Sequence, residues 1–113
     1  MEGAPQPTVV TPEGEVDIAT VGPFRVALAD AARQSERGVL VDLSRVTFID
    51  STGLGALVDL HHRLRREMRR LAVIAPAGSA AAVLLDLTGL KGQLPLFATR
   101  EAALEPESSG RAG

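Results

Sequence analysis

The sequence predicts an α/β fold, in which short strands alternate with amphipathic helices that pack against a sheet. Three observations support this prediction. Short runs of β-branched and aliphatic residues, the densest of them at 39–43, have the composition of buried strands. The longer segments between these runs carry apolar residues at three- and four-residue steps, the periodicity of a helix. Gly and Pro residues separate the two kinds of segment.

The first half of the chain is expected to begin with short strands at 8–10 and 15–18. Because the first is short and Pro12 follows it, its pairing stays open. A first helix is expected from about Pro23, which suits an early helical position, to a point before Gly38. The run 39–43 is the candidate central strand.

A second apolar run ends at Ile49 and leads into a second helix. That helix is expected to bury one side, made of Leu54, Leu57, Val58, His61, Leu64 and Met68.

The second half of the chain is expected to form a strand at 71–75, which Pro76 closes. Ser79 is the expected cap of a third helix that stops near Gly89. Leu94, Leu96 and Phe97 are expected in a last strand, and a short helix is expected from Thr99 to Leu104.

With 113 residues, the chain is long enough for one compact domain. The segments 1–7 and 105–113 are rich in Gly, Pro and Ser, so they are expected to be flexible tails. The folded domain is therefore expected to span residues 8–104.

Composition excludes several classes of function. A net charge of −2 argues against nucleic acid as a partner. The absence of Cys excludes disulfides and thiolate catalysis. We see no signal peptide and no apolar run that could span a membrane, so a cytoplasmic protein without membrane insertion is expected. No phosphate-binding loop motif is present, so no nucleotide cofactor is expected.

The most informative stretch is residues 48–55, which join an apolar run to a helix. Asp50 or Ser51 would cap that helix by accepting hydrogen bonds from its first backbone N–H groups. The simplest interpretation is that Ser51 only caps. Gly53 and Gly55, however, each cost about 0.5–1 kcal/mol relative to Ala inside a helix, and would keep the surface around Ser51 flat.

A helix N-terminus would also tolerate a phosphoryl group on Ser51, which adds about 1.5–2 negative charges. Such a group could change the binding of a partner without unfolding the domain. From these residues alone, capping and a phosphorylation switch both stay open.

Residues 41–55 closely resemble the central motif of STAS domains, in the branch of the anti-anti-sigma factors; they read VDLSRVTFIDSTGLG. Residues 14–17 look like the second-strand motif of that family, and residues 85–90 look like the end of its third helix. The three motifs occur in the family's order, and the resemblance covers roughly residues 8–104.

The resemblance implies a mixed sheet of four or five strands with about four helices, mainly on one face. It implies an anti-sigma factor antagonist without catalytic activity. Ser51 would accept phosphate from an anti-sigma factor that is a serine kinase. The unphosphorylated protein would bind that kinase and release a sigma factor, and a PP2C-type phosphatase would restore it. A monomer is expected. The implied docking surface comprises Asp17, Ile18, Ala19, Thr20, Asp50, Ser51, Thr52, Gly53, Leu54 and Gly55.

Two points qualify this reading. Met68 and Arg69 stand where the family often has a Gly-Gly turn. Moreover, STAS-like domains also serve as accessory subunits of ABC-type membrane transport complexes, in which a residue at this helix start contacts an ATPase without phosphorylation. That role is the alternative function. Thr52 is the alternative phosphoacceptor.

Two further groups of residues invite a functional reading. His61 and His62 are adjacent, so on a helix they point in different directions and are not expected to bind a metal together. His61 is expected at the edge of the core and His62 in solvent. The basic cluster of Arg63, Arg65, Arg66, Arg69 and Arg70 is either a solvated helix face or a surface for an acidic patch on a partner. Asp17 and Asp50 lack the neighbours of a catalytic pair.

Overall fold

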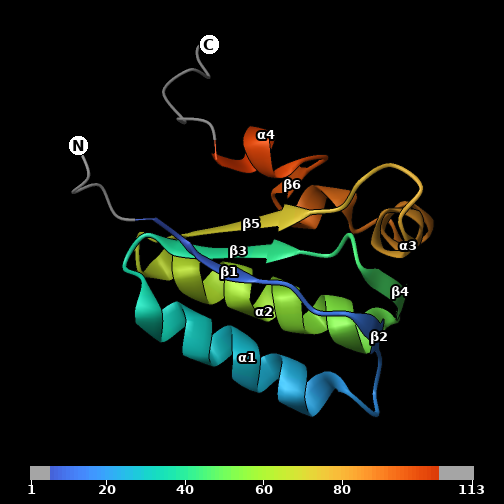
Figure 1. The fold of residues 1–113 in the computed structure, drawn as a ribbon, viewed down its shortest axis with the longest axis horizontal. Helices are drawn as coiled ribbons and strands as arrows, with labels where there is room; N and C mark the ends of the chain where they lie inside the picture. Colours follow the sequence, from blue (N-terminus) through green and yellow to red (C-terminus); the bar gives the residue numbers. More distant parts are fainter. Residues whose placement is uncertain (1–5, 105–113) are drawn as a thin grey trace.

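In the computed structural model, which describes residues 6–104, a four-stranded sheet runs through the centre of the fold (Figure 1). Its strands are β1 (Thr8–Val10), β3 (Gly38–Asp42), β5 (Arg70–Ile74) and β6 (Leu96–Phe97), in the order β1-β3-β5-β6. All five residues of β3 are buried between its neighbours, as its aliphatic composition predicts. β3 is therefore the central strand that the sequence indicated.

A second, smaller sheet lies at one end of the first and consists of β2 (Gly14–Val16) and β4 (Val46–Ile49). The two strands are parallel, with Val16 opposite Ile49. Because they run in the same direction, both strands end at the same edge. The segments that follow them are thereby brought side by side.

The helices α1 (Val21–Gln34) and α2 (Ser51–Arg66) lie next to each other under one face of the main sheet (Figure 1). α3 (Ala80–Thr88) packs against β4, and a 3₁₀ turn, η1 (Lys91–Gln93), follows it. Both α1 and α2 turn an apolar side toward the sheet, as their periodicity predicts. The large core between these layers includes Phe24, Leu28, Val41, Leu57, Leu64, Val73 and Leu85.

α4 (Arg100–Leu104) covers the opposite face of the sheet, where Ala103 packs with Leu40 and Ile74. The side chain of Asp42, at the end of β3, holds α4 in this position. The Asp42 carboxylate accepts hydrogen bonds from the Arg100 Nε and the Ser44 N, both at 2.9 Å. Burial alone would raise the pKa of Asp42, but the hydrogen bonds from Ser44 and Arg100 outweigh it and lower that pKa.

The predicted α/β class is confirmed, with a four-stranded sheet and four helices that lie mainly on one face. The sheet differs from the mixed sheet expected in one respect: every strand pair among residues 6–104 is parallel. The reason is that β1 and β2, which follow each other in the chain, do not form a hairpin. β1 pairs with β3 and β2 pairs with β4. Along the chain, at least one helix therefore separates the two strands of every pair, which allows them to run parallel.

Several element boundaries differ from the predictions by one or two residues; β5, for example, spans Arg70–Ile74 rather than residues 71–75. The differences at β2 and β6 are the larger ones. β2 ends at Val16 rather than at residue 18, because the Asp17 carboxylate closes a turn with the N–H groups of Ala19 and Thr20. β6 excludes Leu94, which lies directly after η1 and is buried in the core.

The helix-end signals of α3 are confirmed. The Ser79 hydroxyl accepts a hydrogen bond from Ala82 N at 3.2 Å, and Gly89 ends the helix with a φ of 74°. Of the two expected tails, residues 1–5 and 105–113 lie outside the described residues. No helix within residues 6–104 is long and apolar enough to cross a membrane.

The end of α2 departs from the expectation for Met68. The helix stops at Arg66, so Met68 does not join its apolar side and is 92% exposed instead. Met68 adopts a φ of 60°, the left-handed conformation in which the Cβ of an L-residue is crowded. The Arg69 N donates to Leu64 O at 2.8 Å, which closes the turn. This is the kind of helix end at which glycine is the usual residue.

Replacing Met68 by Gly is therefore expected to stabilise the domain by about 0.5–1 kcal/mol, because the relief of the left-handed strain exceeds the added entropy of the unfolded chain. The midpoint of urea unfolding measures the effect. Met68→Ala keeps the Cβ and serves as the control. Equal midpoints for the Gly and Ala variants would contradict the assignment of strain to this turn.

Candidate functional site

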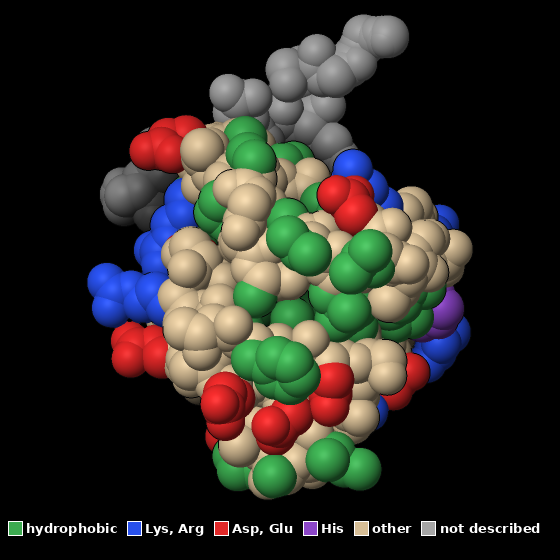
Figure 2. Space-filling model, turned by 90° about the vertical axis from the view of Figure 1, so that its right-hand side faces the viewer, with side chains coloured by type: hydrophobic (Ala, Val, Ile, Leu, Met, Phe, Trp, Pro, Cys, Tyr) green, Lys and Arg blue, Asp and Glu red, His purple; other side chains and the backbone are tan. Residues whose placement is uncertain are grey.

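The start of α2 and the loop after β2 meet at the edge where β2 and β4 both end. Figure 2 looks onto this end of the molecule, the right-hand end in Figure 1. Hydrophobic side chains gather over the middle of this face, with acidic side chains directly below them. The sequence motif and the loop at 17–20 therefore share one surface.

Asp50 links these two segments. It is the N-cap of α2, and its Oδ1 accepts hydrogen bonds from Thr52 N at 3.0 Å and Gly53 N at 3.1 Å. Its Oδ2 accepts a hydrogen bond from Ile18 N at 3.2 Å. One carboxylate thus satisfies two N–H groups of the helix start and one of the neighbouring loop, which fixes their relative position.

The loop itself is tied by its own side chains. The Asp17 Oδ1 accepts hydrogen bonds from Ala19 N at 3.0 Å and Thr20 N at 3.1 Å. The Thr20 hydroxyl accepts from Asp17 N and donates to Glu15 O, each at 2.9 Å. Asp17 and Asp50 therefore use their carboxylates to hold backbone groups.

Ser51 is the first residue of α2, and its side chain is exposed. Because Asp50 supplies the cap, the Ser51 hydroxyl is not needed to hold the helix, and within residues 6–104 it forms no hydrogen bond. Thr52, the alternative acceptor, is half-buried. The site thus presents one accessible hydroxyl on a helix start that is capped independently.

Gly53 and Leu54 form the frame of this site rather than its surface. Leu54 is fully buried. A Cβ on Gly53 would lie 2.8 Å from Val16 Cγ1 and 2.9 Å from Ile49 Cγ1, so only glycine lets α2 pack this closely on the small sheet. The interpretation that Gly53 keeps the outer surface flat is thus replaced by an internal packing reason. A Cβ on Gly55 would meet nothing within 4 Å, so that interpretation stays open only there.

Two apolar side chains on this face are strongly exposed. Ile18, in the loop after β2, is 77% exposed, and Phe48 on β4 is 50% exposed. Ile18 was expected at the docking surface, whereas Phe48 was expected only as part of an apolar run. The burial pattern of β4 is irregular, with Val46 and Ile49 buried and the two residues between them exposed. A regular alternation read from the sequence could not have found this.

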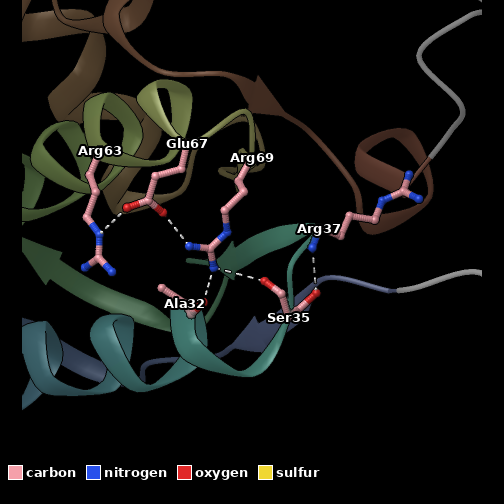
Figure 3. Close-up of polar contacts among 6 residues, drawn as sticks. All are labelled: Ala32, Ser35, Arg37, Arg63, Glu67 and Arg69. Carbon is pink, nitrogen blue, oxygen red and sulfur yellow. Dashed lines mark hydrogen bonds and ion pairs between the residues drawn. The ribbon is translucent and has the colours of Figure 1, made fainter.

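Within the basic cluster, Arg69 has an internal role, because its guanidinium reaches the end of α1 (Figure 3). The Arg69 guanidinium is largely buried and donates hydrogen bonds to Ala32 O, and to Ser35 O at 3.0 Å, at the end of α1. It also pairs with Glu67 at 2.6 Å, and Arg63 reaches the same carboxylate at 3.4 Å. The hydrogen bond from Arg69 is the main reason that the pKa of Glu67 is lowered. Arg69 therefore joins α1 to the turn after α2.

The two histidines lie as expected. His61 is half-buried, His62 is exposed, and their ring centroids are 5.9 Å apart. Burial lowers the pKa of His61, and the nearby Arg65 and His62 lower it further. Within residues 6–104, no group of three or more His, Asp or Glu side chains is placed to hold a metal ion.

Comparison with known proteins places these features in a family context. The STAS domain model matches residues 1–103. An anti-sigma-B factor antagonist of Staphylococcus epidermidis is 32% identical over 78 residues, which cover 69% of this chain and 71% of the relative.

Two solved structures have the same fold. A crystal structure of an anti-sigma factor antagonist from Mycobacterium paratuberculosis matches with a TM-score of 0.74 at 31% identity, covering 85% of this chain and 80% of the other. The anti-sigma factor antagonist SpoIIAA in its unphosphorylated form matches with a TM-score of 0.63 at 22% identity, covering 83% of this chain and 82% of the other.

The two glycines of the site are expected to respond in opposite ways to replacement by Ala. Gly53→Ala should destabilise the domain by about 1–3 kcal/mol, because the new methyl group overlaps Val16 and Ile49. Gly55→Ala should leave the stability unchanged or raise it by up to about 1 kcal/mol, because alanine favours the helix. Urea unfolding of both variants measures the difference. Similar effects of the two substitutions would refute the packing role of Gly53.

Proposed function

The chain belongs to the STAS domain family, in the branch of the anti-sigma factor antagonists, and on that premise we propose that phosphorylation of Ser51 switches its binding to an anti-sigma factor. The unphosphorylated protein binds an anti-sigma factor that is a serine kinase, and a sigma factor is released. One observation carries the proposal: Ser51 offers an exposed hydroxyl at a helix start that Asp50 caps.

The chemistry of the switch follows from this position. The kinase transfers the γ-phosphoryl group of ATP to the Ser51 Oγ; the hydroxyl proton passes to a base on the kinase, and ADP leaves. In the free protein, the positive end of the α2 dipole favours the phosphate, while Asp50 keeps the N–H groups of Thr52 and Gly53. A PP2C-type phosphatase restores the hydroxyl by hydrolysis of the phosphoester.

The same phosphate opposes binding. It adds about 1.5–2 negative charges beside Asp50, on a surface that loses its contact with water when a partner binds. Desolvation of this charge and its repulsion from Asp50 and Asp17 are not offset unless the partner supplies cations at that point. The phosphorylated protein therefore dissociates, while its fold remains as it was.

The docking surface consists of an exposed part and a supporting part. The exposed Ser51, Ile18, Ala19 and Thr20 face the partner, together with the half-buried Asp17 and Gly55. Asp50, Thr52, Gly53 and Leu54 hold these residues in place from below. Ile18, as the most exposed large apolar side chain of the loop, is the main apolar contact. We place this activity in a cytoplasmic monomer whose folded unit spans residues 8–104.

The test incubates the protein with ATP and, one at a time, the purified anti-sigma-type serine kinases of its host. Mass spectrometry of the phosphopeptides should find phosphate on Ser51 in the wild type and in Thr52→Ala, and none in Ser51→Ala. A known family member, labelled by its own kinase, controls for the assay. If that control is labelled and Ser51 is not, the proposed switch is wrong.

A measurement of affinity distinguishes a phosphorylation switch from a contact that does not depend on phosphorylation. Ser51→Asp should bind the kinase at least tenfold more weakly than Ser51→Asn, which has a similar size and no charge, while the two unfold at similar temperatures. Equal affinities would exclude a charge-based switch. Co-purification with an ABC-type ATPase instead of a kinase would favour the role of a transporter subunit.

A further inference from the structure

Helix α3 is apolar on nearly all sides, although one of its sides faces solvent. Ala81 and Leu85 are buried in the core, yet Val83 is 49% exposed and Leu87 is 79% exposed. Asp86 is the only charged residue of the helix. A surface helix normally turns polar residues outward, and one that is apolar all round is normally covered. The outer side of α3 therefore has the character of an interface.

This outer side continues toward Ser51. α3 packs against β4, which carries the exposed Phe48, and β4 pairs with β2, which leads into the loop with Ile18. Half of the eight large apolar side chains that are exposed within residues 6–104 thus belong to α3, β4 and the loop after β2. Figure 2 shows hydrophobic side chains gathered over the middle of the same face. We call the set Ile18, Phe48, Val83 and Leu87 the apolar band.

A hollow beside α3 gives this band a shape that a partner can recognise. The hollow measures about 340 Å³ and lies between α3 and the ends of β5 and β6. Val83 and Phe97 contribute apolar walls, and Asp86 and Lys91 stand at its side. Asp86 pairs with Lys91 at 2.9 Å. Interfaces typically anchor one or two large apolar side chains in pockets of this kind.

The charges around the band indicate the chemistry of its partner. Glu15, Asp17 and Asp50 form no ion pair with any residue in the described range, whereas Lys91 is paired with Asp86. The unpaired charges in the segments beside Ser51 are therefore acidic, whereas the two charged side chains at the α3 hollow pair with each other. A second copy of the same chain would bring the same acidic rim in a symmetric dimer, so it would not be complementary. A partner with basic residues around an apolar protrusion would be.

We propose that the outer side of α3 and its hollow form the second half of the docking surface for the anti-sigma factor. The partner inserts an apolar side chain beside Val83 and Leu87 and places Lys or Arg toward the acidic side chains near Ser51. This inference rests on the proposed function and deepens it, since it assigns the two ends of one surface different tasks. The α3 end contributes affinity, and the Ser51 end makes that affinity sensitive to phosphate.

The test titrates the full chain with each purified anti-sigma-type serine kinase of the host, loaded with Mg²⁺ and ADP, by calorimetry. The double variant Val83→Gln/Leu87→Gln should bind the kinase recognised by the wild type at least tenfold more weakly. Asp86→Lys should also weaken it. Val26→Gln, a matched change at a 61% exposed apolar side chain on α1, should bind within twofold of the wild type.

The outcomes distinguish this inference from the function on which it rests. If the wild type binds a kinase and both α3 variants bind it equally well, α3 lies outside the interface and the inference is overturned alone. If no kinase binds the wild type, the proposed function fails and this inference fails with it. If the α3 variants only abolish self-association of the chain in sedimentation, a second copy covers α3 and the inference is overturned. If the double variant does not fold, the affinity of Asp86→Lys, which changes an exposed position, tests alone whether α3 lies in the interface.

Discussion

The Asp50 carboxylate is the interaction on which the site depends. It accepts hydrogen bonds from the N–H groups of Thr52 and Gly53 in the first turn of α2. It also accepts one from the N–H group of Ile18, which lies 32 positions earlier in the chain. Parallel pairing of β2 and β4 brings the two segments together, but pairing alone would leave these N–H groups without an acceptor at a partly buried edge. A side chain without a suitable acceptor at position 50 would disconnect the loop from the helix.

This arrangement separates stability from signalling. Because the cap is supplied by the residue before it, Ser51 can be modified without loss of a hydrogen bond that the helix needs. The glycine at position 53 serves the fold by bringing α2 close to Val16 and Ile49. The surface that a partner can touch is then small, apolar in the middle and acidic at its edges. A single phosphate is a large perturbation on such a surface and a minor one in the interior.

The sequence predicted the elements better than their arrangement. The aliphatic run of β3, the Ser79 cap and the turn at Gly89 could be predicted because they depend on local composition and backbone preference. The parallel pairing of β2 with β4 depends on contacts between distant segments, so no local pattern reveals it. For the same reason, the hydrogen bonds from Arg69 to the end of α1 were not predicted. Met68 was also wrongly placed on the apolar side of α2. Ser51 was singled out by resemblance to a family, since spacing and composition left phosphorylation open but favoured capping as the simpler interpretation.

Modification of Ser51 is thus expected to change a surface and leave the fold unchanged. Amide ¹H–¹⁵N spectra of the protein before and after phosphorylation by its kinase measure both effects. We expect shifts confined to the loop at 17–20, the first turns of α2 and their immediate neighbours, with the amides of β3 and β5 unmoved. Shifts that spread through the central sheet would contradict this expectation, because they would mean that the phosphate acts by remodelling the domain.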